Sequence, residues 1–97
     1  MADIWADIAA HISQVTQQPF YGKQTRSVGG GCINQAYGLS DGQTTFFIKL
    51  NQASKLAMFE AELAGLKEMY DSRAIRVPQP ICSGVAGANS YIVMEWL

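Results

Sequence analysis

The spacing of apolar residues changes along the chain, and the first spacing predicts a helix. Between residues 4 and 15 apolar side chains recur every three or four residues, which is typical of an amphipathic helix. This stripe comprises Ile4, Trp5, Ile8, His11, Ile12 and Val15. Pro19 ends the pattern. We therefore expect an opening helix in which His11 is a packed, hydrogen-bonded side chain rather than a ligand or a base.

From Thr25 onward the pattern changes to short runs that predict strands. One run leads from Thr25 to three glycines, and INQAYGLS (33–40) and QTTFFIKLN (43–51) follow. Asp41-Gly42 separates the last two runs, and an Asp-Gly pair between strands predicts a hairpin. These runs therefore predict three successive antiparallel strands.

The second half of the chain predicts one more helix and two more strands. SKLAMFEAELAGLKEMYDS (54–72) has helical spacing. Its stripe comprises Leu56, Phe59, Leu63, Leu66 and Tyr70. RVPQP (76–80) predicts an extended connection, and ICSGVAGANSYIVMEWL (81–97) predicts two strands joined by a glycine-containing loop.

This order predicts an α+β fold with a five-stranded antiparallel sheet. An N-terminal helix precedes the sheet, and one helix lies between strands 3 and 4. The same arrangement forms the N-terminal lobe of the kinase-like fold. At 97 residues, 48% of them hydrophobic, the chain is long enough for one core, so we expect a single domain over residues 1–97.

Composition excludes several classes of function. The net charge of −1 disfavours binding to nucleic acid or to an anionic membrane surface. No apolar run approaches the ~20 residues that cross a bilayer, and the N-terminus lacks the pattern of a signal peptide. We expect a cytoplasmic protein with no nucleic-acid or membrane partner. Cys32 and Cys82 lack metal-ligand spacing, so reduced thiols and no metal site are expected.

By themselves, the three glycines in VGGGCINQAYG (28–38) favour a plain turn between strands over a phosphate-binding loop, so the neighbouring residues must decide. Walker and dinucleotide-binding loops both need a helix directly after the glycines, and none is predicted after Gly31. A glycine-rich turn between two strands, with a lysine on the next strand, is instead the arrangement that covers ATP phosphates in kinases.

Lys49 lies in FFIKLN, on a strand that is apolar on both faces. An unpaired buried ammonium is costly, so either the lysine reaches solvent along its stem or a carboxylate pairs with it. Glu60 and Glu62 lie on opposite flanks of the apolar stripe of the following helix, and either could be the partner. In kinases a glutamate on this helix pairs with the phosphate-binding lysine. The alternative is that the glutamates are simply exposed to solvent.

The closing VMEWL (93–97) is either an ordinary core strand or the strand that ends beside a nucleotide base. In the second case the backbone after the strand offers a carbonyl and an amide to the edge of adenine.

GGGCINQAY, FFIKLN, MFEAELAGLKEM, RVPQP and YIVMEWL together resemble the N-terminal lobe of the fructosamine (ketosamine) kinase family, relatives of aminoglycoside and choline kinases. The resemblance implies an enzyme that uses ATP and magnesium to phosphorylate the sugar C3 hydroxyl of glycated amines or proteins. This reaction repairs glycation. The alternative is another small-molecule phosphotransferase of the aminoglycoside or choline kinase type.

The resemblance also implies roles for individual residues. Lys49 would hold the α- and β-phosphates, and Glu62 would orient it, with Glu60 as the alternate. Met94 would lie behind the base, and Trp96 is expected to face outward. Phe47 replaces a small residue two places before the lysine of protein kinases and shares its face of the strand. The phosphate-covering loop would be Gly29, Gly30, Gly31, Cys32, Ile33 and Asn34, and the hinge would be Glu95, Trp96 and Leu97.

The motifs of a second lobe, which carry the catalytic aspartate and the magnesium ligands of kinases, do not occur in this sequence. The sequence ends at the predicted hinge, so we expect the catalytic C-terminal lobe to lie outside it. No catalytic base or metal ligand is assigned here. The 97-residue chain by itself is expected to be inactive and to bind ATP weakly or not at all.

A different class of function is that of an interaction module. A lobe that ends at its hinge exposes the surface meant for the second lobe, which favours a homodimer. The glycine-rich segment could exchange its first strand between two copies. Cys32 would then be a redox-sensitive residue able to link the copies and block the nucleotide loop, whereas an inert cysteine is the alternative. Cys82 is expected to stay reduced.

Overall fold

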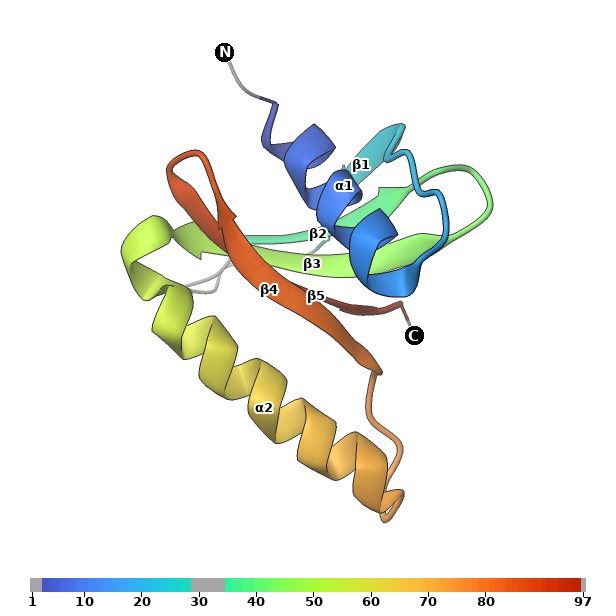
Figure 1. Ribbon diagram of the computed structural model, residues 1–97, viewed down its shortest axis with the longest axis vertical. Helices are drawn as coiled ribbons and strands as arrows, with labels where there is room; N and C mark the ends of the chain where they lie inside the picture. Colours follow the sequence, from blue (N-terminus) through green and yellow to red (C-terminus); the bar gives the residue numbers. More distant parts are fainter. Residues whose placement is uncertain (1–2, 29–34, 97) are drawn as a thin grey trace.

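The computed structural model describes residues 3–28 and 35–96. Within them the elements are α1 (Ile4–Thr16), β1 (Gln24–Ser27), β2 (Gln35–Ser40), β3 (Thr45–Gln52), the 3₁₀ turn η1 (Ala53–Lys55), α2 (Leu56–Ser72), β4 (Pro80–Ala86) and β5 (Asn89–Glu95). The strands form one antiparallel sheet in the order β1-β2-β3-β5-β4 (Figure 1). The predicted fold class, the five strands and the positions of both helices are confirmed.

The helix α1 begins at a side-chain cap and buries one stripe. The carboxylate of Asp3 accepts a hydrogen bond of 2.9 Å from the backbone N–H of Trp5, which satisfies a free donor of the first turn. Ile8 and Ile12 are fully buried against the sheet. Val15 was expected to share this stripe, but 46% of it is exposed, because the last turn of α1 borders a hollow instead of the core.

Alternation along the strands divides the core into two layers. In β3, Ile48 and Leu50 join the core under α1, whereas Phe47 packs with the residues under α2. In β5, Val93 belongs to the first layer and Ile92 to the second. Because successive side chains of a strand point to opposite faces, α1 and α2 cover opposite faces of one sheet.

The β2–β3 connection confirms a turn at Asp41-Gly42 but is longer than a two-residue hairpin. The carboxylate of Asp41 accepts hydrogen bonds from the backbone N–H groups of Gln43 (2.9 Å) and Thr44 (2.8 Å). These bonds lower the pKa of Asp41. Gly42 has a φ of 97°, which L side chains rarely adopt. β3 therefore starts at Thr45, two residues after the start of the predicted run.

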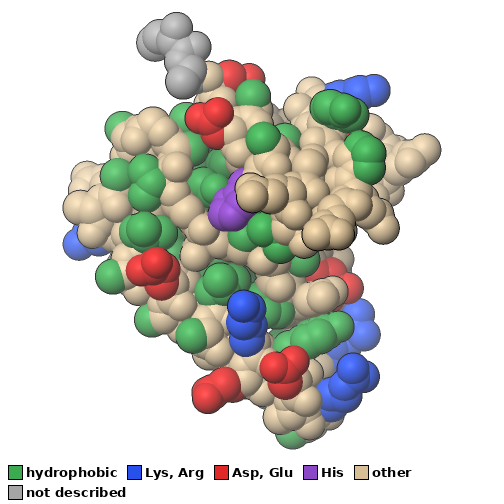
Figure 2. All heavy atoms as spheres, in the orientation of Figure 1, with side chains coloured by type: hydrophobic (Ala, Val, Ile, Leu, Met, Phe, Trp, Pro, Cys, Tyr) green, Lys and Arg blue, Asp and Glu red, His purple; other side chains and the backbone are tan. Residues whose placement is uncertain are grey.

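The helix α2 packs against β4 and β5 and faces solvent with its other side. Phe59 is fully buried, whereas Leu63 and Leu66 are half-buried against the same cluster. Charged side chains of both signs gather over the lower part of the molecule, where α2 lies in Figure 1 (Figure 2). In the described part of the chain, no helix is both long enough and apolar enough to cross a membrane.

A polar contact joins α1 to the sheet. His11 Nδ1 lies 2.5 Å from the hydroxyl of Tyr91 on β5, so the prediction of a packed, hydrogen-bonded histidine is confirmed. Burial raises the pKa of Tyr91 to about 12. Burial likewise raises the pKa of the nearby Cys82 thiol to about 12, which makes it a poor nucleophile.

Candidate functional site

An ion pair joins β3 to α2 on the face of the sheet opposite α1. Lys49 Nζ lies 2.5 Å from Glu62 Oε2. The side chains are 23% and 32% exposed, so the pair is half-buried and still reachable from solvent. Of the two glutamates considered from the sequence, Glu62 makes this contact, and Glu60 is exposed. Residues that are two positions apart on a helix lie about 200° apart around its axis, so only one of the two glutamates can face β3.

The ion pair borders a part of the sheet that no described helix covers. Because α2 packs on β4 and β5 and reaches β3 at Phe47 and Lys49, the same face of β1 and β2, together with the neighbouring edge of β3, is left without a helix over it in the described ranges. The register and alternation of the strands place Ala36, Gly38, Phe47 and Lys49 on this open face. Phe47 thus shares the face of Lys49, as strand alternation predicted.

The strands that flank the glycine-rich segment are anchored beside Lys49. Ala36 pairs directly with Lys49 across β2 and β3. The backbone N–H of Val28 donates a 2.9 Å hydrogen bond to the carbonyl of Ala36. Residues 29–34, predicted as the phosphate-covering loop, lie outside the described residues. The flanking residues Val28 and Ala36 are nevertheless held together at the point where β2 pairs with the backbone of Lys49.

The end of β5 carries the predicted base-binding segment. Met94 is buried against Phe59 and Ile92. Glu95 is fixed to the segment before β4, because its backbone N–H donates to the carbonyl of Gln79 (2.9 Å) and its carboxylate accepts from the N–H of Gln79 (3.1 Å). Leu97, the last predicted hinge residue, lies outside the described residues.

The prediction that Trp96 faces outward is wrong. Its ring packs back onto the open face of the sheet, with its centroid 6.1 Å from that of Phe47. The guanidinium of Arg26 lies 5.8 Å from the centroid of the same ring. The ring can lie there because Gly38 has no side chain in the way. Sequence reasoning missed Gly38, although a glycine inside a predicted strand often marks a close approach.

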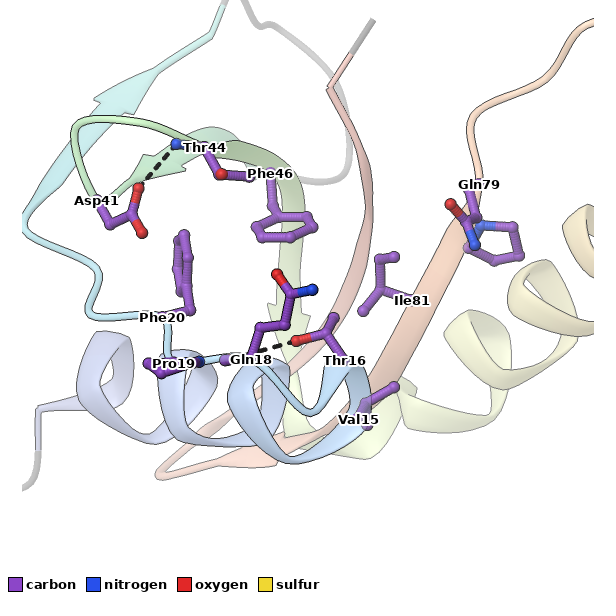
Figure 3. Close-up of a pocket in the computed structure, with 11 residues that line it drawn as sticks. Val15, Thr16, Gln18, Pro19, Phe20, Asp41, Thr44, Phe46, Gln79 and Ile81 are labelled. Atoms are coloured by element: carbon purple, nitrogen blue, oxygen red, sulfur yellow. Dashed lines mark hydrogen bonds between the residues drawn. The ribbon is translucent and has the colours of Figure 1, made fainter.

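The hollows near this end of the sheet include one on each of its faces. One, of about 640 Å³, is on the open face and includes Arg26, Gly38, Thr45 and Trp96 in its lining. The other, of about 500 Å³, is bordered by the C-terminal part of α1 and the start of β4 (Figure 3).

The second hollow lies away from the ion pair. Figure 3 shows Phe20 and Phe46 pointing into it, and Asp41 bonded to Thr44 at its rim. Phe46 is adjacent to Phe47 in β3 and therefore points to the α1 side of the sheet. This hollow is separate from the site around Lys49, because the Lys49–Glu62 ion pair lies on the other face of the sheet.

The chemistry of the site suits an anionic ligand, and no metal centre is found among the described residues. An ammonium fixed by a carboxylate on an open sheet face is suited to an anionic ligand. Across residues 3–28 and 35–96, no group of three His, Cys, Asp or Glu side chains is placed to hold a metal ion. We therefore assign no magnesium ligand in these ranges.

The sequence matches one protein family along nearly its whole length. The family model described as fructosamine kinase matches residues 4–97. The chain is 54% identical over 93 residues to a probable ketoamine kinase of Synechocystis, covering 96% of the chain and 32% of that protein. It is 47% identical over 72 residues to the chloroplastic protein-ribulosamine 3-kinase of Arabidopsis thaliana, covering 73% of the chain and 22% of that protein.

Solved structures share the fold. A Haemophilus somnus protein assigned as a fructosamine-3-kinase superposes with a TM-score of 0.88 at 24% identity, over 93% of this chain and 30% of that one. An aminoglycoside phosphotransferase in complex with AMP-PNP and hygromycin B gives 0.53 at 10% identity, over 93% of this chain and 29% of that one. The chain thus spans about a third or less of the length of these proteins. The extent of the family match shows that this chain belongs to the fructosamine kinase family.

Proposed function

We propose that this chain is the ATP-binding lobe of a ketosamine 3-kinase. The observation that carries the proposal is the Lys49–Glu62 ion pair on the open face of the sheet, beside the anchored flanks of the glycine-rich segment. Lys49 would bind the α- and β-phosphates, and Glu62 would keep its ammonium in place when no nucleotide is bound. Residues 29–34 would cover the phosphates with backbone N–H groups.

The base would lie beside the strand end at Met94 and Glu95, where main-chain groups can meet the adenine edge. ATP supplies the phosphoryl group, and magnesium would be held outside the described residues. The substrate would be a glycated amine or protein whose sugar C3 hydroxyl accepts the phosphoryl group, which is the first step of deglycation. The relatives named as ketoamine and ribulosamine kinases support this choice.

A nucleotide titration of the 97-residue chain tests the role of Lys49. We expect Mg-ATP to bind weakly, with amide shifts at Ala36, Phe47 and Glu95 in ¹⁵N NMR spectra and no turnover, because the catalytic groups are missing. Lys49→Met should abolish these shifts. Lys55→Met is the matched control, because Lys55 is exposed on η1 and should leave them unchanged. Equal shifts in Lys49→Met and the wild type would contradict the proposal.

A test of the substrate class needs a catalytic lobe, which we expect in the additional length of the relatives. We expect a protein that joins this chain to such a lobe to phosphorylate fructosyl-lysine or ribulosyl-lysine. Phosphorylation of choline or of an aminoglycoside instead would favour the alternative phosphotransferase. That alternative draws on the shared fold of the aminoglycoside phosphotransferase alone.

The homodimer, the strand exchange and the Cys32 link stay predictions, because Cys32 lies outside the described residues. Strand exchange is compatible with β1, a four-residue edge strand that is exposed throughout. Non-reducing gels after mild peroxide treatment of the wild type and Cys32→Ala test the link. A covalent dimer that survives the substitution would exclude the Cys32 link. The thiol of Cys82 is buried and is not expected to form such a dimer. The cytoplasmic location also stays a prediction.

A further inference from the structure

The ring of Trp96 packs into a depression of the sheet, called the seat, which has room for it because residue 38 is a glycine. The seat is formed by Arg26, Gly38, Thr45 and Phe47. A Cβ added to Gly38 would lie 2.9 Å from Cζ3 of Trp96 and 3.4 Å from its Cη2. Real Cβ atoms essentially never come within 3.0 Å of such a neighbour, so an alanine here must displace the indole. The indole thus lies close over the β2 backbone at Gly38, where any side chain would force the ring to shift.

Three strands contribute to this seat. Gly38 on β2 forms its floor, and Thr45 on β3 lines the same hollow. Phe47 on β3 meets the indole at an interplanar angle of 42°. Arg26 on β1 places its guanidinium 5.8 Å from the ring centroid, within the range of a cation–π interaction. One side chain at the end of β5 is thus held by residues from β1, β2 and β3.

The neighbouring residue is fixed from the opposite side. Glu95 exchanges two hydrogen bonds with the backbone of Gln79, one through its own N–H and one through its carboxylate. The main chain of Glu95 and Trp96 is therefore held between Gln79 and the seat on Gly38. Recognition of a base by main-chain groups depends on the position of that main chain, because a carbonyl and an amide have no rotamers with which to adapt.

We infer that Trp96, seated on Gly38, is a positioning residue that fixes the main chain after β5 for binding the nucleotide base. The inference rests on the proposed function and adds the device that sets the position of the base-binding segment. Trp96 would act through its own backbone and through Glu95, while its indole packs on the sheet. Trp96 is only half-buried, so this role is separable from a role in the core.

The first test measures how well the ring of Trp96 is packed in the seat when no nucleotide is present. In a Trp5→Phe background, Trp96 is the only tryptophan, because the sequence has two. We expect Gly38→Ala to red-shift the emission of Trp96 and to increase its quenching by acrylamide, since the displaced ring becomes more exposed. Gly65→Ala is the matched control, because a Cβ at Gly65 has no neighbour within 4 Å. Unchanged emission in Gly38→Ala would overturn the inference.

The second test measures nucleotide affinity by the NMR titration with Mg-ATP. We expect Gly38→Ala and Trp96→Ala to weaken binding about tenfold. Trp96→Phe, which keeps an aromatic ring for the seat, should retain most of the affinity, and Gly65→Ala should retain all of it. Because Gly38→Ala also adds a methyl group inside β2, Trp96→Ala provides the same test with Gly38 intact.

The outcomes separate the inference from the proposed function. If Lys49→Met abolishes nucleotide shifts but Trp96→Ala and Gly38→Ala do not weaken them, the positioning role is wrong and the proposed function stands. If Trp96→Ala weakens binding and Trp96→Phe does not, the positioning role is supported. If the wild type shows no nucleotide shifts even when this chain is joined to a catalytic lobe, the proposed function fails and the positioning role fails with it.

Discussion

The substitution Phe59→Ala tests how strongly the helix that carries Glu62 is attached to the sheet. Phe59 is fully buried between α2 and β5, where it packs with Ile92 and Met94. A buried phenylalanine removes about 150–250 Å² from water, which at about 25 cal/mol per Å² corresponds to roughly 4–6 kcal/mol as an upper bound. Phe→Ala substitutions in cores cost about 3–5 kcal/mol. We therefore expect the free energy of unfolding to fall by about 3–5 kcal/mol.

This loss is large against the total stability of a small domain, which is about 5–15 kcal/mol. Urea unfolding followed by far-UV circular dichroism measures it. Phe59→Leu should lie between the wild type and Phe59→Ala, because it leaves a smaller cavity. Met58→Ala is the matched control, since Met58 is the preceding residue and is 40% exposed, and it should cost less than about 1 kcal/mol. A loss below about 1.5 kcal/mol for Phe59→Ala would refute the placement of α2.

Three further predictions concern α1 and the sheet beneath it. Gly84→Ala should lower the stability by about 1–3 kcal/mol in thermal unfolding, because its Cβ would lie 2.7 Å from the hydroxyl of Tyr91 and disturb the bond to His11. Stability should also fall as the pH rises from about 9 to about 12, because the pKa values of Cys82 and Tyr91 are raised from 9.0 and 10.0 to about 12 and the folded chain holds both protons more tightly. Thermal melts across this range should show a steeper fall above about pH 10 in the wild type than in Tyr91→Phe, which keeps the contribution of Cys82. Asp3→Ala should cost about 1 kcal/mol in urea unfolding, because it removes the cap of α1, and an unchanged midpoint would contradict that role.

The sequence by itself determined the elements and their order. Apolar spacing at Ile8 and Ile12 is helical, and alternation around Ile48 is that of a strand, because each spacing matches the geometry that buries one face. Asp41-Gly42 marked a turn for a local reason, since the aspartate bonds the next amides and the glycine takes a positive φ. Such local rules also named Lys49 as a residue that needs a partner.

Only the tertiary structure decided which residues meet. Apolar spacing left Glu60 and Glu62 open, because both flank the same stripe, and only the family resemblance favoured Glu62. The rotation of α2 on the sheet brings Glu62 to Lys49. The prediction from the sequence placed Trp96 outward, because nothing in the neighbouring residues shows that Gly38, far away in the chain, leaves room for an indole. Contacts of this kind depend on strand order and register, which are set by the packing of the whole sheet and not by any short segment.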